Sequence, residues 1–233
     1  MYATFYQTNS SGFTLDLSTW NTSKVTNMQQ AFGQSSITSI NLSGSFSTEN
    51  VTNIQQLFYN CQGLKTIIGI EDWNVSKLQN MTSTFSLCYD LQPLDLSKWN
   101  TASLTNLNGT FTSCFRGLTS INLSGWNTSN VTNMNNLFNG CSVLEEINLS
   151  EWDMTKATAF NTVFNGTTVL TNINMEDSNV TSVNKVVSVI PAKTADVPGT
   201  IYVDTVTDDM DVTTANSKYW NIVTELGDGG SND

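Results

Sequence analysis

The sequence contains no histidine and is poor in proline and in charged residues. Without histidine, the chain lacks the commonest general base and a common metal ligand, which argues against an enzyme or a metal site. Only 12% of its 233 residues are charged, and the net charge of −11 disfavours binding to the phosphate backbone of nucleic acids. No stretch approaches the roughly 18 consecutive apolar residues of a membrane span.

A repeat of 26 or 27 residues runs through most of the chain. A phenylalanine marks it without exception, and a tryptophan and a cysteine recur at the same intervals. The phenylalanines are Phe32, Phe58, Phe85, Phe111, Phe138 and Phe164; the tryptophans are Trp20, Trp73, Trp99, Trp126 and Trp152, with Phe46 in the gap; the cysteines are Cys61, Cys88, Cys114 and Cys141. This period predicts a solenoid, in which each repeat packs only against its neighbours.

Two patterns within each repeat predict its local structure. The spacing L-x-x-L-x-L, as in Leu118, Ile121 and Leu123, is typical of a short strand with one buried face. From Val131 to Phe138, apolar residues follow at positions 0, +3, +6 and +7, which is the spacing of one helix face. We therefore predict an α/β solenoid, a leucine-rich-repeat array of six to seven 26–27-residue turns. A parallel sheet covers one face, short helices cover the other, and a C-terminal cap closes the array.

The domain boundaries are placed where the repeat pattern is no longer recognisable. Residues 1–186 form the solenoid, and Phe5 lies 27 residues before Phe32, so we expect the chain to start mid-repeat. Residues 187–226 form the cap and residues 227–233 a flexible tail.

Within the cap, "GTIYVD" is predicted to be the last strand. "TTANSKYWNIV" is predicted to be a short helix that turns Tyr219, Trp220 and Ile222 inward. A cap of this kind would close the end of the core and keep the array in solution.

Three recurring positions have competing interpretations. The cysteines, one per turn, are predicted to be buried free thiols, with disulfides between neighbouring turns as the alternative. The tryptophans are predicted to form an inward spine, with carbohydrate stacking as the alternative. The asparagines at the fixed position before the methionine are predicted to bond backbone groups of neighbouring turns. These asparagines are Asn27, Asn53, Asn80, Asn106 and Asn133.

An acidic cluster lies near the C-terminus. It could bind Ca²⁺, but it lacks the EF-hand spacing and its glycine, so a solvated loop is the better interpretation. The cluster consists of Asp204, Asp208, Asp209 and Asp211. We expect no cofactor and no metal.

The stretches "LDLSTWNTSKVTNMQQAF" and "INLSGWNTSNVTNMNNLFNGC" resemble the 26-residue repeats of BspA-like leucine-rich-repeat bacterial surface proteins. The resemblance covers about residues 1–186, and its motif W-N-T-S-x-V-T-N-M is specific. It implies a secreted or surface-anchored protein that acts in adhesion. A signal peptide or anchor would then lie outside this sequence.

The leading hypothesis is a non-catalytic adhesion module whose extended polar repeat face binds a host or bacterial surface protein or glycan. The alternatives are a structural spacer, a virion decoration protein, or an accessory domain of a larger enzyme. We expect an extracellular or cell-surface monomer that binds no nucleic acid. The outward side chains of the strands form the candidate binding face: Asp16, Asn41, Asp95, Asn122, Asn148, Asn174, Ser120 and Glu146.

Overall fold

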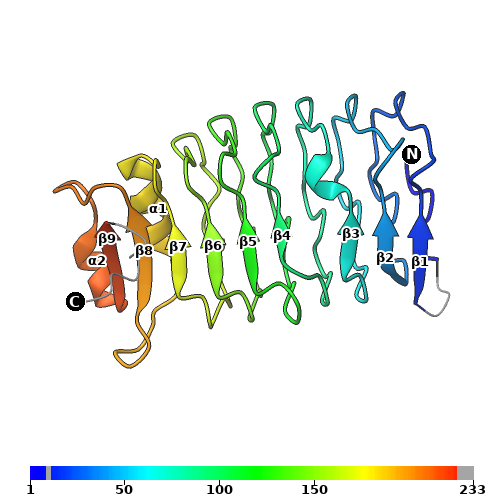
Figure 1. The fold of residues 1–233 in the computed structure, drawn as a ribbon. Helices are drawn as coiled ribbons and strands as arrows, with labels where there is room; N and C mark the ends of the chain where they lie inside the picture. The colour runs from blue at the N-terminus through cyan, green and yellow to red at the C-terminus, as the bar shows by residue number, and fades with distance from the viewer. Residues whose placement is uncertain (9–11, 225–233) are drawn as a thin grey trace, which may run out of the picture.

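The alternating apolar residues of each repeat form one short strand per turn of a parallel solenoid (Figure 1). The computed structural model describes residues 1–8 and 12–224. The strands of the repeats are β1 (Phe13–Asp16), β2 (Ile37–Asn41), β3 (Thr66–Ile68), β4 (Leu94–Asp95), β5 (Ser120–Asn122), β6 (Glu146–Asn148) and β7 (Asn172–Asn174). The predicted array of 26-residue turns is confirmed.

The parallel sheet is divided into two parts. Strands β1–β3 form one sheet, and β4–β7 form another, which two further strands extend. Residues at the centre of the strands stay in register, so that Ile121 pairs with Leu94 on one side and Ile147 on the other. The division follows β3, where the chain makes a 3₁₀ helix, η1 (Ile70–Asp72), after the left-handed Gly69. That turn contains one residue more than its neighbours between the leucine-type positions.

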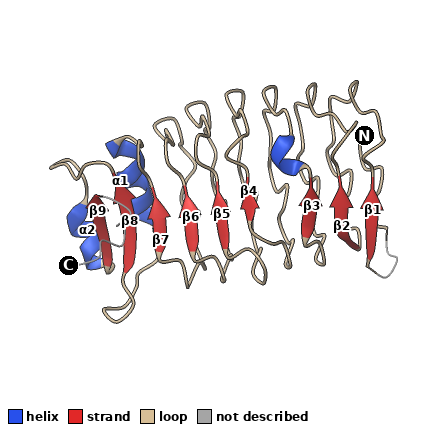
Figure 2. Cartoon of the chain, viewed as in Figure 1, coloured by secondary structure: helices blue, strands red, loops and turns tan. Residues whose placement is uncertain are grey.

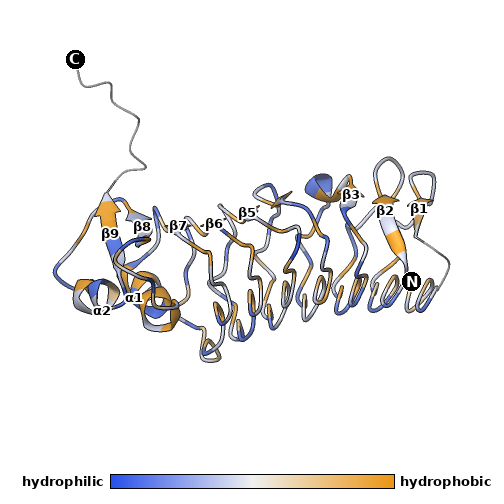
Figure 3. Cartoon of the chain, turned by 90° about the horizontal axis from the view of Figure 1, so that it is seen from below, coloured by the Kyte–Doolittle hydropathy of each residue, from blue (hydrophilic) through white to orange (hydrophobic). Residues whose placement is uncertain are grey.

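The prediction of short helices opposite the strands is wrong. Figure 2 shows loops and turns there, and helix in residues 1–8 and 12–224 is confined to η1 and the C-terminal segment. The backbone instead bonds to the next turn of the solenoid, as from Met134 N to Ala159 O at 2.8 Å and from Phe138 N to Val163 O at 2.9 Å. These bonds form a second ladder of parallel bridges. Figure 3, seen from below, shows the loops of successive turns stacked on the side opposite the strands. The bridges join Asn27, Asn53, Asn80, Asn106, Asn133 and Ala159.

Left-handed residues explain why turns replace a helix. Asn136 and Gly140, in the predicted helical stretch and just after it, have φ angles of 58° and 76°. An α-helix of L-residues does not accommodate that conformation, whereas asparagine and glycine adopt it at little cost. A tight turn about every three residues places Met134 and Leu137 inward at the same spacing as a helix. The apolar period alone therefore does not distinguish the two structures.

The asparagines form corners. At the fixed position before the methionine, each side-chain oxygen accepts a hydrogen bond from the backbone N–H two residues later, as from Gln55 N to Asn53 Oδ1 at 2.8 Å. This Asx turn lies within one turn of the solenoid. Where such a side chain reaches a neighbouring turn, as from Asn53 Nδ2 to Gln29 Oε1 at 3.5 Å, its acceptor is another side chain. The prediction that these asparagines bond backbone groups of neighbouring turns through their side chains is therefore wrong. Asn127 makes the same bond with Ser129, and Asn122 with Ser124, at two other corners. The abundance of asparagine therefore reflects the number of corners.

The repeated aromatic residues form continuous columns in the core. Neighbouring phenylalanine rings from Phe32 to Phe164 stack with centroids 5.3–5.9 Å apart, and Phe5 extends the column at 5.5 Å from Phe32. Trp73 to Trp152 form a second column at 5.9–6.1 Å and are buried, which confirms the inward spine. Trp20 departs from it, with 40% of its surface exposed.

The cysteines are free and fully buried, as predicted. Each Sγ donates to the carbonyl of a phenylalanine in the preceding turn, as from Cys88 to Phe58 O at 3.1 Å and from Cys114 to Phe85 O at 3.2 Å. Burial raises the pKa of the Cys61 thiol to about 11 and also raises the pKa values of Cys88 and Cys114 well above the usual value. These three thiols therefore stay protonated at neutral pH, and the column packs as small apolar side chains.

The C-terminal segment continues the sheet. It forms α1 (Val180–Val189), β8 (Gly199–Val203), α2 (Val212–Ser217) and β9 (Trp220–Thr224), with β8 paired to β7 and β9 to β8. The predicted last strand is therefore followed by another, and the predicted helix ends before Trp220. Trp220 is buried as expected and Ile222 is partly buried, but Tyr219 is 49% exposed. The division at residue 186 stays a prediction, and the predicted tail at 227–233 lies outside the described residues.

Among the described residues, no helix is long and apolar enough to cross a membrane. The same residues contain no group of three or more acidic or cysteine side chains placed to hold a metal ion. In the acidic cluster, Asp211 caps α2 by accepting a hydrogen bond from Thr214 N at 3.0 Å.

Candidate functional site

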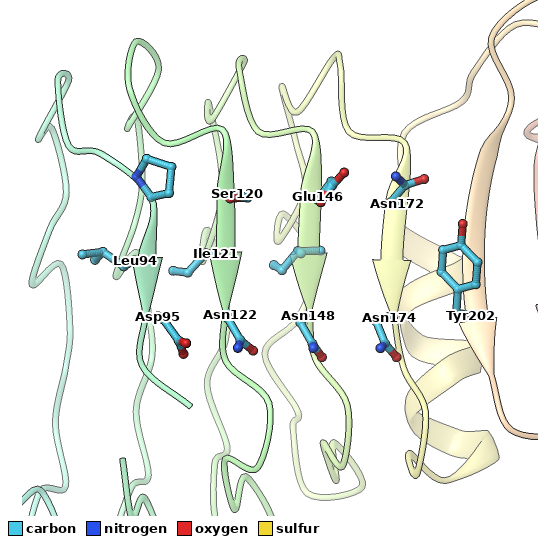
Figure 4. Close-up of a pocket in the computed structure, with 12 residues that line it drawn as sticks. Leu94, Asp95, Ser120, Ile121, Asn122, Glu146, Asn148, Asn172, Asn174 and Tyr202 are labelled. Carbon is cyan, nitrogen blue, oxygen red and sulfur yellow. The ribbon is translucent and has the colours of Figure 1, made fainter. Parts of the chain in front are cut away.

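An open groove of about 510 Å³ crosses the outer face of β4–β8 (Figure 4). The residues at the centre of successive strands, including Leu94 and Ile121, form its floor, and polar side chains lie along both sides. Six of the eight predicted face residues line it: Asp95, Ser120, Asn122, Glu146, Asn148 and Asn174. The structure thus gathers most of the predicted face into one concave surface.

Asp16 and Asn41 do not belong to this groove. They lie on β1 and β2, beyond the division of the sheet, and Ile68 follows Asn41 in register with 53% of its surface exposed. A second open groove of about 460 Å³ occupies the division and is lined in part by Ile68, Lys65 and Lys98. The predicted continuous face is therefore two surfaces of different character.

One side of the groove is a ladder of Asx corners at the ends of the strands. Asp95, Asn122, Asn148 and Asn174 occupy successive register positions. Each accepts a hydrogen bond from the N–H two residues later, at 2.8–3.1 Å. The corner holds the side-chain oxygen, whereas an amide nitrogen carries two hydrogens that the corner does not use. Asn174 uses one of these hydrogens on Glu176 Oε2 at 2.9 Å, and Asn122 uses one on Asp95. The remaining amide hydrogens of these fixed side chains can bond a partner.

The other side of the groove is formed by the residues that come directly before the buried isoleucines in successive strands. Ser120, Glu146 and Asn172 line the groove in register, and Thr200 continues the column on β8 beyond the lining residues. Glu146 is exposed and the other three are partly buried. Hydroxyl, carboxylate and amide groups therefore face the amide ladder across the strand floor.

Two polar contributors to the groove, Asn172 and Tyr202, were missing from the predicted face. Asn172 flanks Ile173 as Ser120 flanks Ile121, so alignment of the repeats could have found it. Tyr202 pairs in register with Asn174 and ends the ladder with an aromatic ring. The alternation in "GTIYVD" already placed this tyrosine opposite the buried Ile201, but a strand of the C-terminal segment was not expected to extend the face.

The electrostatics of the groove are mildly acidic. Hydrogen bonds from the Ser97 hydroxyl and N–H hold the pKa of Asp95 below its usual value, helped by Asn122 and Lys98. The carboxylate is therefore ionised at neutral pH. No lysine or arginine lines this groove in the described part of the chain. It can accept and donate hydrogen bonds but provides no positive charge to hold an anion.

Comparison with known proteins identifies a family. The family described as "Mycoplasma protein of unknown function, DUF285" matches residues 1–93, 37–116 and 92–197. No curated protein and no solved structure matches the chain. The matched segments overlap and together cover the solenoid and the start of its C-terminal segment.

Proposed function

We propose that this chain, which belongs to the DUF285 family, is a non-catalytic binding module of a bacterial surface. The groove over β4–β8 is the observation that carries the proposal. It is open and polar, and its corners fix the ladder side chains before a partner arrives. Such a surface suits many weak hydrogen bonds along an extended partner better than the enclosure of a small molecule.

We also propose kinship with BspA-like leucine-rich-repeat surface proteins, on the basis of the repeated motif W-N-T-S-x-V-T-N-M. A location outside the cell or on its surface accords with that kinship. The partner would be a host or bacterial surface protein or glycan. Modest affinity at each groove would gain strength from many copies on one cell.

The chemistry of the groove supports a role without catalysis. Ser120 and Tyr202 carry the hydroxyl groups of the groove, and the sequence has no histidine to activate either of them. The ionised Asp95 closes a corner of the backbone. These groups can position a partner through hydrogen bonds.

The proposal is tested by placing lysines along one side of the groove. The variant Ser120→Lys, Glu146→Lys, Asn172→Lys should retain its fold, because these side chains project from the outer face of the strands. Its retention on bacterial or host cell surfaces should fall about tenfold or more, because three long cations fill the groove and remove its acceptors. Binding of the fluorescently labelled chain, measured by flow cytometry, checks this.

The matched control carries the same change of charge elsewhere. Glu49→Lys, Gln79→Lys and Ala102→Lys alter exposed residues away from the strands, and this variant should bind as the parent does. Equal loss in both variants would show a general effect of charge. Undiminished binding of the groove variant would reject the groove as the binding surface.

A further inference from the structure

We propose, resting on the function above, that the groove over β4–β8 binds an uncharged linear glycan that lies across the strands. The ligand would run along the solenoid axis, between the amide ladder and the facing column of Ser120, Glu146 and Asn172. The proposal narrows the partner from any surface molecule to hydroxyl-rich chains without charge.

The hydrogen-bonding groups of the groove match sugar hydroxyls. A hydroxyl both donates and accepts, so it needs donors and acceptors within reach of one another. The amides of Asn122 and Asn148 provide donors, and the carboxylates of Asp95 and Glu146 provide acceptors. A polypeptide backbone would offer only one donor and one acceptor per residue.

The Asx corners alone would not indicate a ligand, because every turn uses them to fold. The second observation is the composition of the rest of the groove. Glu146 and Asn172 are not needed for a corner, yet they stand in register opposite the ladder. Tyr202 then ends the ladder with a partly exposed ring, on which the apolar face of a sugar could stack.

Charge decides against acidic ligands. The groove contains two carboxylates and no cation among its described lining residues. Lys65 and Lys98 line the neighbouring groove and not this one. Lys98 interacts with Asp95 but is mostly exposed, so solvent and salt screen its charge. Uronic-acid, sulfated and phosphate-bearing polymers would therefore meet repulsion, whereas neutral chains would not.

The spacing of the groove suits a regular polymer. Neighbouring strands lie about 4.7–4.9 Å apart, so the ladder repeats at that interval along the axis. An extended glycan advances by a similar distance per sugar, so successive sugars would meet successive ladder residues. Several contacts would form in the same geometry, and each would be weak.

The test changes the donors of the ladder without disturbing its corners. The variant Asn122→Asp, Asn148→Asp keeps the oxygen that accepts from the backbone, as Asp95 does naturally. The control variant Asn106→Asp, Asn133→Asp makes the same change at adjacent corners of the opposite ladder. Circular dichroism and thermal melting establish that both variants fold.

Affinity electrophoresis of the full chain measures binding directly. The gels contain hydroxyethylcellulose, laminarin, mannan or dextran as neutral probes, and polygalacturonate or heparin as acidic probes. At least one neutral probe should retard the parent and the control variant. Apparent affinity should fall about tenfold or more in the groove variant, through lost amide donors and added negative charge. A Tyr202→Ala variant should also bind more weakly.

The outcomes separate the glycan proposal from the wider function. If no neutral probe retards the parent, or an acidic probe retards it more, the glycan proposal is overturned. The binding function would survive if the groove still mediated retention on cells and protease treatment of those cells abolished it, which would indicate a protein partner. Equal loss in the two aspartate variants would overturn the placement of the glycan in this groove.

Discussion

Replacing Trp126 with alanine should lower the free energy of unfolding by about 3–5 kcal/mol. Its indole is 1% exposed and stacks between Trp99 and Trp152, with centroids 5.9 and 6.1 Å away. The substitution opens a cavity between two turns that cannot close without moving the whole stack. Equilibrium denaturation in urea, followed by far-UV circular dichroism, measures the change.

Substitution by phenylalanine separates packing from hydrogen bonding. Trp126 Nε1 donates to Leu96 O at 2.8 Å. Loss of this bond in Trp126→Phe should lower the free energy of unfolding by about 1 kcal/mol, in addition to the effect of the smaller ring. Trp73 is the matched control, because its buried Nε1 has no acceptor in the structure. Trp73→Phe should therefore lower the free energy of unfolding by less than Trp126→Phe does. A Trp126→Ala variant as stable as the parent would contradict the tryptophan spine.

Removing the C-terminal segment should cause aggregation and abolish the cooperative melting transition. A chain that ends at Ile190 lacks β8 and β9 and uncovers the edge of β7, including the fully buried Ile173. The last turn would present its apolar end and unpaired strand edge to water, and aggregation should follow. Light scattering and thermal melting measure this against a chain that ends at Thr224.

The contacts of Trp220 show why this segment closes the core. It is fully buried, and its Nε1 donates to Pro191 O at 2.8 Å. A Cβ atom at Gly199 would clash with the Trp220 ring, because the backbone of Gly199 packs directly on it. Lys218 Nζ donates to three carbonyls at the end of α1: Val187 O at 2.9 Å, Ser188 O at 3.0 Å and Ile190 O at 3.3 Å. A shortened chain that stayed monomeric with an unchanged melting transition would show the segment to be an appendage.

Much of this fold could be predicted because the same apolar pattern recurs in every repeat, so each copy supports the interpretation of the others. The Phe32-to-Phe164 column, the buried thiols and the parallel strands followed from spacing alone. The helices did not, since a turn every three residues and a helix place apolar residues inward at nearly the same positions. The left-handed φ of Asn136 distinguishes them, and asparagine tolerates that conformation better than most residues.

The candidate site was predictable only in part. Asn122 and Asn148 were placed correctly on the outer face, because strand alternation fixes their side. The exclusion of Asn41 was not predictable, because it depends on how the insertion before Ile70 interrupts the sheet. Tyr202 was missed because its strand lies outside the repeat, and pairing across a change of sequence pattern depends on tertiary structure.

Hydroxyl-radical footprinting with mass spectrometry tests most directly whether the groove is the binding surface. The chain is oxidised with and without the cell-surface material that retains it. Leu94 and Tyr202 in the groove should be protected, while Tyr59 and the exposed Tyr219 outside it should react equally in both samples. Protection of Tyr59 or Tyr219 with no protection of Leu94 and Tyr202 would contradict the account.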